Sequence, residues 1–228
     1  MNGDTLQRHI LSTYNSLRIG MFVIAAATPV VIVLWAYIFG ISWQNSISAY
    51  YFAPLANKLE YSAYPGRVPF VGILFALGSF LYLYKGFSWR EDVALNLAGL
   101  FALGVALCPM YAQQNYIPFS NVLHFAFAVL LFICVAYTAV FCQNETLQWV
   151  VDARRRARYR MAYHVIGFAM GLFPLVGLAL AVSFHAVQRH VFWIELAGIW
   201  AFAAYWLTKS LELKGSEVEL KAVSGRLT

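Results

Sequence analysis

Six long apolar stretches run through this chain and restrict what it can fold into. A helix rises about 1.5 Å per residue, so about 20 apolar residues cross the hydrocarbon core of a bilayer. Hydrophobic residues make up 61% of the 228 residues and charged residues only 11%, which is typical of integral membrane proteins. We therefore predict an all-α membrane protein, with a bundle of six transmembrane helices over residues 19–210. The expected spans are Ile19–Ile41, Val68–Phe87, Val93–Tyr111, Asn121–Cys142, Met161–Phe184 and Val191–Thr208.

The positive charges predict which way this bundle faces. Of the sixteen Lys and Arg residues, only Lys58, Arg67 and Arg189 fall on one side of the predicted spans, and the other thirteen fall on the opposite side. Lys and Arg collect in the cytoplasmic segments of membrane proteins. Both termini are therefore predicted to be cytoplasmic. The same bias accounts for the net charge of +6 without nucleic-acid binding.

A basic segment before the fifth span predicts contact with lipids. Five arginines stand beside the membrane there and suit the anionic headgroups of membrane lipids, although an orientation signal alone is the favoured explanation for them. These arginines are Arg154, Arg155, Arg156, Arg158 and Arg160.

Three segments outside the spans have their own expected roles. Residues 1–18 mix polar and apolar positions, which favours an amphipathic segment on the inner membrane surface. Residues 42–67 form an outer loop rich in Trp, Tyr and Phe, and we expect this aromatic loop to fold over the mouth of the bundle. Residues 211–228 are charged and are expected to form a cytoplasmic tail.

Ionisable side chains inside the apolar layer are the main candidates for a site, because burying them in a membrane is costly. Glu195 and His124 lie near the outer ends of their spans, and His185 and His190 flank the last outer turn. Three interpretations stay open: Glu195 pairs structurally with His124, Arg67 or Arg189; the group forms a ligand pocket; or the histidines bind a metal. The full candidate pocket consists of His124, Glu195, His185, His190, Arg67, Arg189, Ser48 and Tyr51.

A second polar pair lies at the inner side of the third span. Asp92 and Asn96 are four residues apart and share one helix face. Asp92 is expected to cap the start of that helix and to pair with Lys85 or Arg90. Asn96 is expected to bond a neighbouring helix.

Short motifs along the spans resemble those of six-span membrane proteins of the DRAM and FRAG type, and more closely those of a group of bacterial six-span proteins of unknown function. The resemblance implies a six-helix bundle with a polar outer pocket, no established enzyme activity, and a bacterial inner membrane as its location. The motifs are Ser46-Ile47-Ser48 with Arg67 and Phe70; His124, Ala128 and Phe132; Phe70-Val71-Gly72; Asp92, Asn96 and Gly99; and Gly104-Val105-Ala106-Leu107.

These observations favour a non-catalytic membrane protein that binds a lipid or another amphipathic molecule in its outer half, with no metal or other cofactor. The alternative is an intramembrane hydrolase that holds Zn²⁺ with His124, His185 and His190. Those positions are similar to the three-histidine arrangement of alkaline ceramidases and progestin-receptor-like proteins, whose serine, aspartate and His-x3-His spacing is missing here. A small transporter or channel is the third interpretation.

Overall fold

The computed structural model describes residues 3–53, 64–108, 110, 119–183 and 191–214, and these residues form helices with no β-strand among them. Each predicted apolar stretch overlaps one long helix. The long helices are α1 (Gly3–Ile38), α2 (Arg67–Leu83), α3 (Trp89–Leu107), α4 (Phe119–Tyr137), α6 (Ala153–Ser183) and α7 (Val191–Lys214). The short elements are the 3₁₀ helix η1 (Ser48–Phe52), the π-helical turn η2 (Thr138–Cys142) that continues α4, and α5 (Asn144–Leu147).

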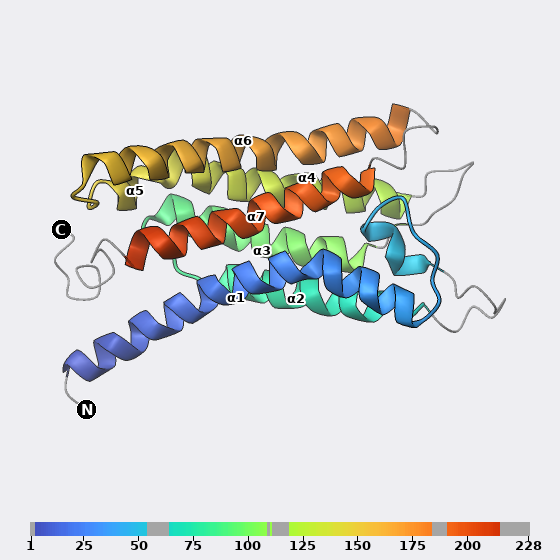
Figure 1. Cartoon of the computed structure of the whole chain (residues 1–228), viewed down its shortest axis with the longest axis horizontal. Helices are drawn as coiled ribbons and strands as arrows, with labels where there is room; N and C mark the ends of the chain where they lie inside the picture. Colours follow the sequence, from blue (N-terminus) through green and yellow to red (C-terminus); the bar gives the residue numbers. More distant parts are fainter. Residues whose placement is uncertain (1–2, 54–63, 109, 111–118, 184–190, 215–228) are drawn as a thin grey trace.

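The six long helices form a closed ring. In this ring α1 packs on α2, α2 on α3, α3 on α4, α4 on α6, α6 on α7, and α7 on α1 again. Neighbouring helices run in opposite directions (Figure 1). The start of α1 and the end of α7 therefore lie at one end of the bundle, which we call the terminal end, while η1 lies at the opposite, loop end (Figure 1).

The outside of the ring is apolar. Leu34, Leu100, Phe141 and Phe168 are each more than half exposed, as expected for side chains that face lipid rather than water. Four helical segments are long and apolar enough to cross a membrane: Thr5–Ile38, Phe119–Leu147, Ala153–Ala179 and Val191–Lys214. Helix α2 is apolar but has only 17 residues. The chain is thus a helical membrane protein with at least these four candidate spans.

Polar residues continue several helices beyond the predicted apolar stretches. Residues 3–18 of the expected surface segment form the first part of α1, which runs unbroken from Gly3 through Pro29 to Ile38. Figure 1 shows its first turns extending away from the neighbouring helices. Helix α7 continues to Lys214, so the first four residues of the expected tail are helical and Glu212 is buried. Residues 215–228 lie outside the described residues.

The basic segment is also helical. All five arginines lie on the first turns of α6, where Asp152 Oδ1 accepts hydrogen bonds from the backbone N–H groups of Arg154 and Arg155 at 2.8 and 3.3 Å. An acidic residue at this position satisfies free amides and offsets the unfavourable charge of arginines near a helix N-terminus. Arg154, Arg155 and Arg158 are exposed, as contact with headgroups would require.

Candidate functional site

A cavity of about 150 Å³ lies inside the helix ring, and residues from all six long helices and from the aromatic loop line it. Its walls are almost entirely apolar. Among the described lining residues, the polar side chains are Thr28, Ser48, His124 and Glu195. Thr28 donates to the carbonyl of Ile24 in its own helix, so the remaining three supply the polar character of the cavity.

Glu195 anchors the aromatic loop to α7. Its Oε2 accepts hydrogen bonds from the backbone N–H groups of Ile47 at 2.6 Å and Ser48 at 3.3 Å, and its Oε1 accepts one from Ser48 Oγ at 2.9 Å. The loop also provides an acceptor for a free amide in the first turn of α7, because the N–H of Phe192 donates to the carbonyl of Asn45 at 2.8 Å. One of the sequence-based interpretations paired Glu195 with His124 or Arg67. Among the described residues, its carboxylate is instead bonded to the loop.

The described part of the loop folds over the end of the ring, as predicted. Tyr50 and Tyr51 are buried, and the Tyr51 ring packs edge-on against Phe70 of α2 at 5.9 Å. The Arg67 guanidinium lies over the rings of Tyr51 and Phe52, 4.9 and 5.4 Å from their centroids. Arg67 and Tyr51 therefore stabilise the loop beside the cavity and do not line it.

His124 lies at the same end of the cavity and is only 3% exposed. Its Nδ1 is 2.7 Å from the carbonyl oxygen of Cys108, and its ring stacks on Phe70. A carbonyl only accepts hydrogen bonds, so this contact places a proton on Nδ1.

The structure therefore brings three of the eight predicted pocket residues, Ser48, His124 and Glu195, to one end of the cavity. His185, Arg189 and His190 lie outside the described residues. Within the described ranges no group of three His, Cys, Asp or Glu side chains could hold a metal ion. Because two of the three suggested zinc ligands are outside those ranges, the zinc hypothesis stays a prediction.

The predicted inner pair behaves differently from the expectation. Ser88, not Asp92, caps α3, because its Oγ accepts the backbone N–H of Glu91. Asp92 instead accepts a hydrogen bond from the backbone N–H of Gly86. It also pairs with Lys85 at 3.2 Å, and Lys85 is one of the two partners suggested from the sequence. The Oδ1 atom of Asn96, which was expected to bond a neighbouring helix, is buried and has no hydrogen-bond partner in the described part of the chain.

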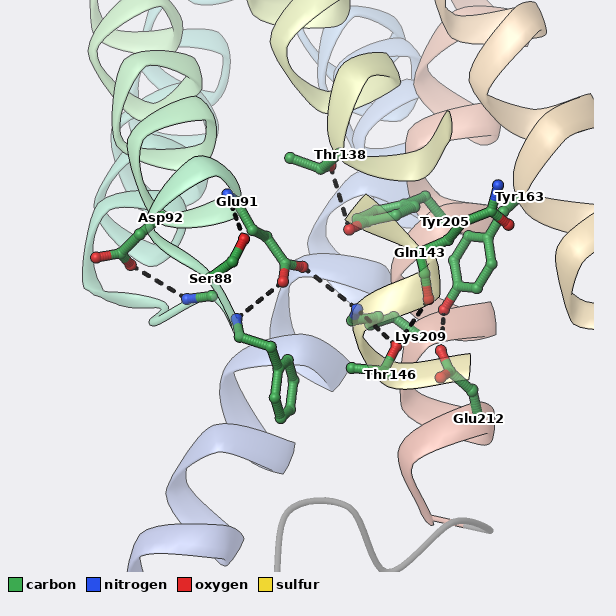
Figure 2. A network of polar contacts seen from close by, with 12 residues as sticks. Ser88, Glu91, Asp92, Thr138, Gln143, Thr146, Tyr163, Tyr205, Lys209 and Glu212 are labelled. Atoms are coloured by element: carbon green, nitrogen blue, oxygen red, sulfur yellow. Dashed lines mark hydrogen bonds and ion pairs between the residues drawn. The ribbon is translucent and has the colours of Figure 1, made fainter. Parts of the chain in front are cut away.

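The buried acidic side chain of α3 is Glu91, the residue before Asp92. Its Oε1 pairs with Lys209 Nζ of α7 at 3.3 Å, and its Oε2 accepts the N–H of Phe87 at 2.9 Å. The two paired side chains are 0% and 2% exposed, and Lys209 also donates to Thr146 Oγ1 (Figure 2).

Further polar contacts surround this ion pair. Tyr163 of α6 donates its hydroxyl proton to Glu212 Oε2, and Thr138 Oγ1 donates to the Tyr205 hydroxyl at 3.2 Å (Figure 2). Arg18 of α1 is also buried. We call the four buried charges at this end the terminal cluster. They are Arg18, Glu91, Lys209 and Glu212.

Sequence reasoning missed the terminal cluster, although two signals for it were present. Ser88 and Glu91 have the Ser-x-x-Glu spacing of a capping box, which turns the Glu91 side chain back toward the preceding turn. Lys209 and Glu212 are three residues apart, so they share a helix face.

Comparison with protein-family models, with curated proteins and with solved structures found no match to this chain. The resemblance to DRAM- and FRAG-type proteins therefore stays a prediction that rests on the short motifs above.

Proposed function

We propose that this chain is a six-span membrane protein that binds a lipid or another amphipathic molecule in the cavity inside its helix ring, without a catalysed reaction. The observation that carries this proposal is the distribution of polarity in the cavity. Its walls are apolar, and Ser48, His124 and Glu195 lie together at its loop end. Such a cavity suits a molecule with an apolar body and a polar group at one end.

The size of the cavity agrees with this class of ligand. An apolar protein cavity of about 150 Å³ stays dry and accepts a guest the size of benzene. The cavity here, at about 150 Å³, thus has room for part of an acyl chain rather than for a whole phospholipid. The rest of the molecule would lie between helices or at the loop end.

The three polar residues would have different roles. Glu195 already accepts three hydrogen bonds from the loop, so it would hold the loop in place over the ligand. His124 and the Ser48 hydroxyl are the groups we expect to meet the polar end of the ligand. A loop fixed in advance lowers the ordering cost of binding.

We place the protein in a bacterial inner membrane with its terminal end in the cytoplasm. In this arrangement α2 and α3 form a hairpin and complete the six spans. The exposed side chains of Arg154, Arg155 and Arg158 would then meet anionic headgroups at the inner surface, which adds about 1 kcal/mol per basic residue.

Two glycines of α6 allow a test that separates the cavity from the surface. Gly177 lines the cavity, and a Cβ there would have one ordinary contact, at 3.5 Å from Ile194, whereas a Cβ on Gly171 would meet nothing within 4 Å. Gly177→Leu should fill the cavity, and Gly171→Leu is the matched control on the same helix.

The probe is phosphatidylglycerol with a photoreactive diazirine in one acyl chain, incorporated into vesicles with the purified protein. We expect cross-links on cavity-lining peptides of the wild type, reduced by about tenfold in Gly177→Leu, as for a loss of roughly 1.4 kcal/mol, and unchanged in Gly171→Leu. Equal labelling of the two variants would contradict the proposal. One equivalent of zinc on the purified protein, lost in His124→Ala, would support the hydrolase instead.

A further inference from the structure

The terminal cluster lies below the cavity and closes the ring at that end. Phe202 lines the cavity and packs on Trp206, with ring centroids 6.3 Å apart. Trp206 in turn packs edge-on against Tyr84 and Tyr205 at 5.1 and 5.0 Å. An aromatic layer thus separates the cavity from the terminal end, where the buried Glu91–Lys209 pair lies.

The pair bridges helices that are not neighbours. Glu91 belongs to α3 and Lys209 to α7, and the order of packing places these two helices opposite each other in the ring. The bond between them therefore crosses the lumen instead of joining two adjacent helices. Breaking it would leave the ring intact on both sides while removing a tie across its centre.

Stability alone is a poor explanation for this arrangement. Replacing a buried ion pair with well-packed apolar residues is often neutral or stabilising, so a buried pair contributes little net stability. Ionisable groups at membrane depth more often belong to pathways and switches. Polar groups at this end are also only partly satisfied, because Glu212 Oε1 of the terminal cluster and Nε1 of the neighbouring Trp206 are buried without a hydrogen-bond partner among the described residues.

Helix α7 takes part in the closure of both ends. Glu195 holds the loop over one end of the cavity, and Lys209 holds Glu91 across the other. The two residues are about four helical turns apart on one helix. A tilt of α7 about either of these residues would displace the other one from its partner.

We propose that the Glu91–Lys209 pair is a latch that closes the ring at the terminal end, and that the protein is a carrier that moves its amphipathic ligand through the ring when this latch opens. The ligand is that of the proposed function, on which this inference rests. The substrate class is therefore a lipid with an apolar chain and a small polar head.

A native cysteine can report on the latch. Cys142 is 1% exposed and ends η2, four residues before Thr146, whose hydroxyl accepts a hydrogen bond from Lys209. The chain has three cysteines, so replacing Cys108 and Cys134 with serine leaves Cys142 as the single thiol. Its reaction with a membrane-impermeant maleimide in vesicles then measures how often water reaches the latch.

We expect Glu91→Gln and Lys209→Met each to raise the labelling rate of Cys142 by at least about tenfold, because removing one partner of a buried pair shifts an opening equilibrium by more than that factor. Asp92→Asn breaks the half-exposed pair with Lys85 at the same end and should leave the rate unchanged.

The charge-reversed double variant Glu91→Lys with Lys209→Glu rebuilds the pair and should restore slow labelling, which separates opening of the latch from misfolding. Labelling of the single variants at the background rate would overturn the latch. So would fast labelling of a double variant that is folded by circular dichroism.

The carrier activity has its own readout. Vesicles that contain the protein should move fluorescent phosphatidylglycerol between leaflets faster than protein-free vesicles, as followed by dithionite quenching, and the two latch variants should change that rate while Asp92→Asn does not. No transfer with intact photolabelling of the cavity would overturn the carrier alone. Loss of photolabelling would overturn the proposed function itself.

Discussion

Replacing Glu195 with alanine should release the aromatic loop from the end of the ring. Ile47 and Ser48 are 2% and 5% exposed, and the Glu195 carboxylate accepts both of their backbone N–H groups. Alanine offers no acceptor, so two buried amides would lose their partner. Buried backbone donors are almost always paired in native proteins, and the loop would have to open to let water reach them.

The contacts set the size of the effect. A hydrogen bond to a charged group contributes about 1.5–3 kcal/mol, and the contact from Ile47 at 2.6 Å belongs in that range. The contact from the Ser48 N–H at 3.3 Å is weaker. A total of roughly 3 kcal/mol corresponds to about 100-fold more frequent opening of the loop. Glu195→Gln keeps one oxygen acceptor and loses the charge, so it should cost only about 1 kcal/mol.

Hydrogen exchange measured by mass spectrometry on a peptide covering residues 42–53 checks this estimate. Exchange at Ile47 and Ser48 should be about 100-fold faster in Glu195→Ala and about fivefold faster in Glu195→Gln, because exchange follows the free energy of local opening. Asp92→Asn, at the opposite end of the ring, should leave this peptide unchanged. If exchange in Glu195→Ala equals that of the wild type, or rises equally in α2 and α7, the reasoning is wrong.

Two further substitutions test the packing of the ring. Tyr163→Phe removes the hydroxyl that donates to Glu212 and should lower the free energy of unfolding by about 2 kcal/mol, whereas Tyr82→Phe, at a side chain that is 63% exposed, should change it by less than about 0.5 kcal/mol. Gly99→Ala would place its Cβ 2.6 Å from a backbone carbonyl of α2 and should cost about 1–3 kcal/mol, while Gly171→Ala meets nothing within 4 Å and should be stable. Unfolding in detergent, followed by tryptophan fluorescence, measures both pairs, and equal stability within either pair would contradict the packing described here.

The positions of the helices could be predicted from hydropathy, but their ends could not. The six apolar stretches overlap the six long helices, because a membrane favours long apolar helices. Hydropathy falls where charged residues begin, yet helix α6 starts eight residues before the predicted Met161. Arginine is a good helix former, and Asp152 caps the first turn. Local capping therefore extends this helix toward its N-terminus, beyond the start that the apolar pattern predicts.

The terminal cluster illustrates a different limit of sequence reasoning. Asp92 and Glu91 are adjacent acidic residues in the first turn of α3, and successive residues on a helix point about 100° apart. Only the closure of the ring decides that Glu91 faces the lumen while Asp92 faces Lys85. Lys209 likewise follows the predicted sixth span, so the sequence indicates only one more cytoplasmic charge there. The three-residue spacing to Glu212 places both charges on one helix face, but which face is buried follows from helices that are distant in the sequence.

The distribution of polarity along the ring also bears on what could pass through it. Polar groups lie at its two ends, around Glu195 and around the Glu91–Lys209 pair, and the cavity between them is apolar. An ion or a sugar would have to give up its hydration along that stretch without replacement contacts, which costs many kcal/mol for a charge. An apolar chain gains free energy there, and its polar head has partners at the ends. In the proposed transfer the head crosses the apolar stretch only while the latch is open and water enters the ring. This arrangement therefore disfavours an ion channel and favours a ligand that is itself apolar along most of its length.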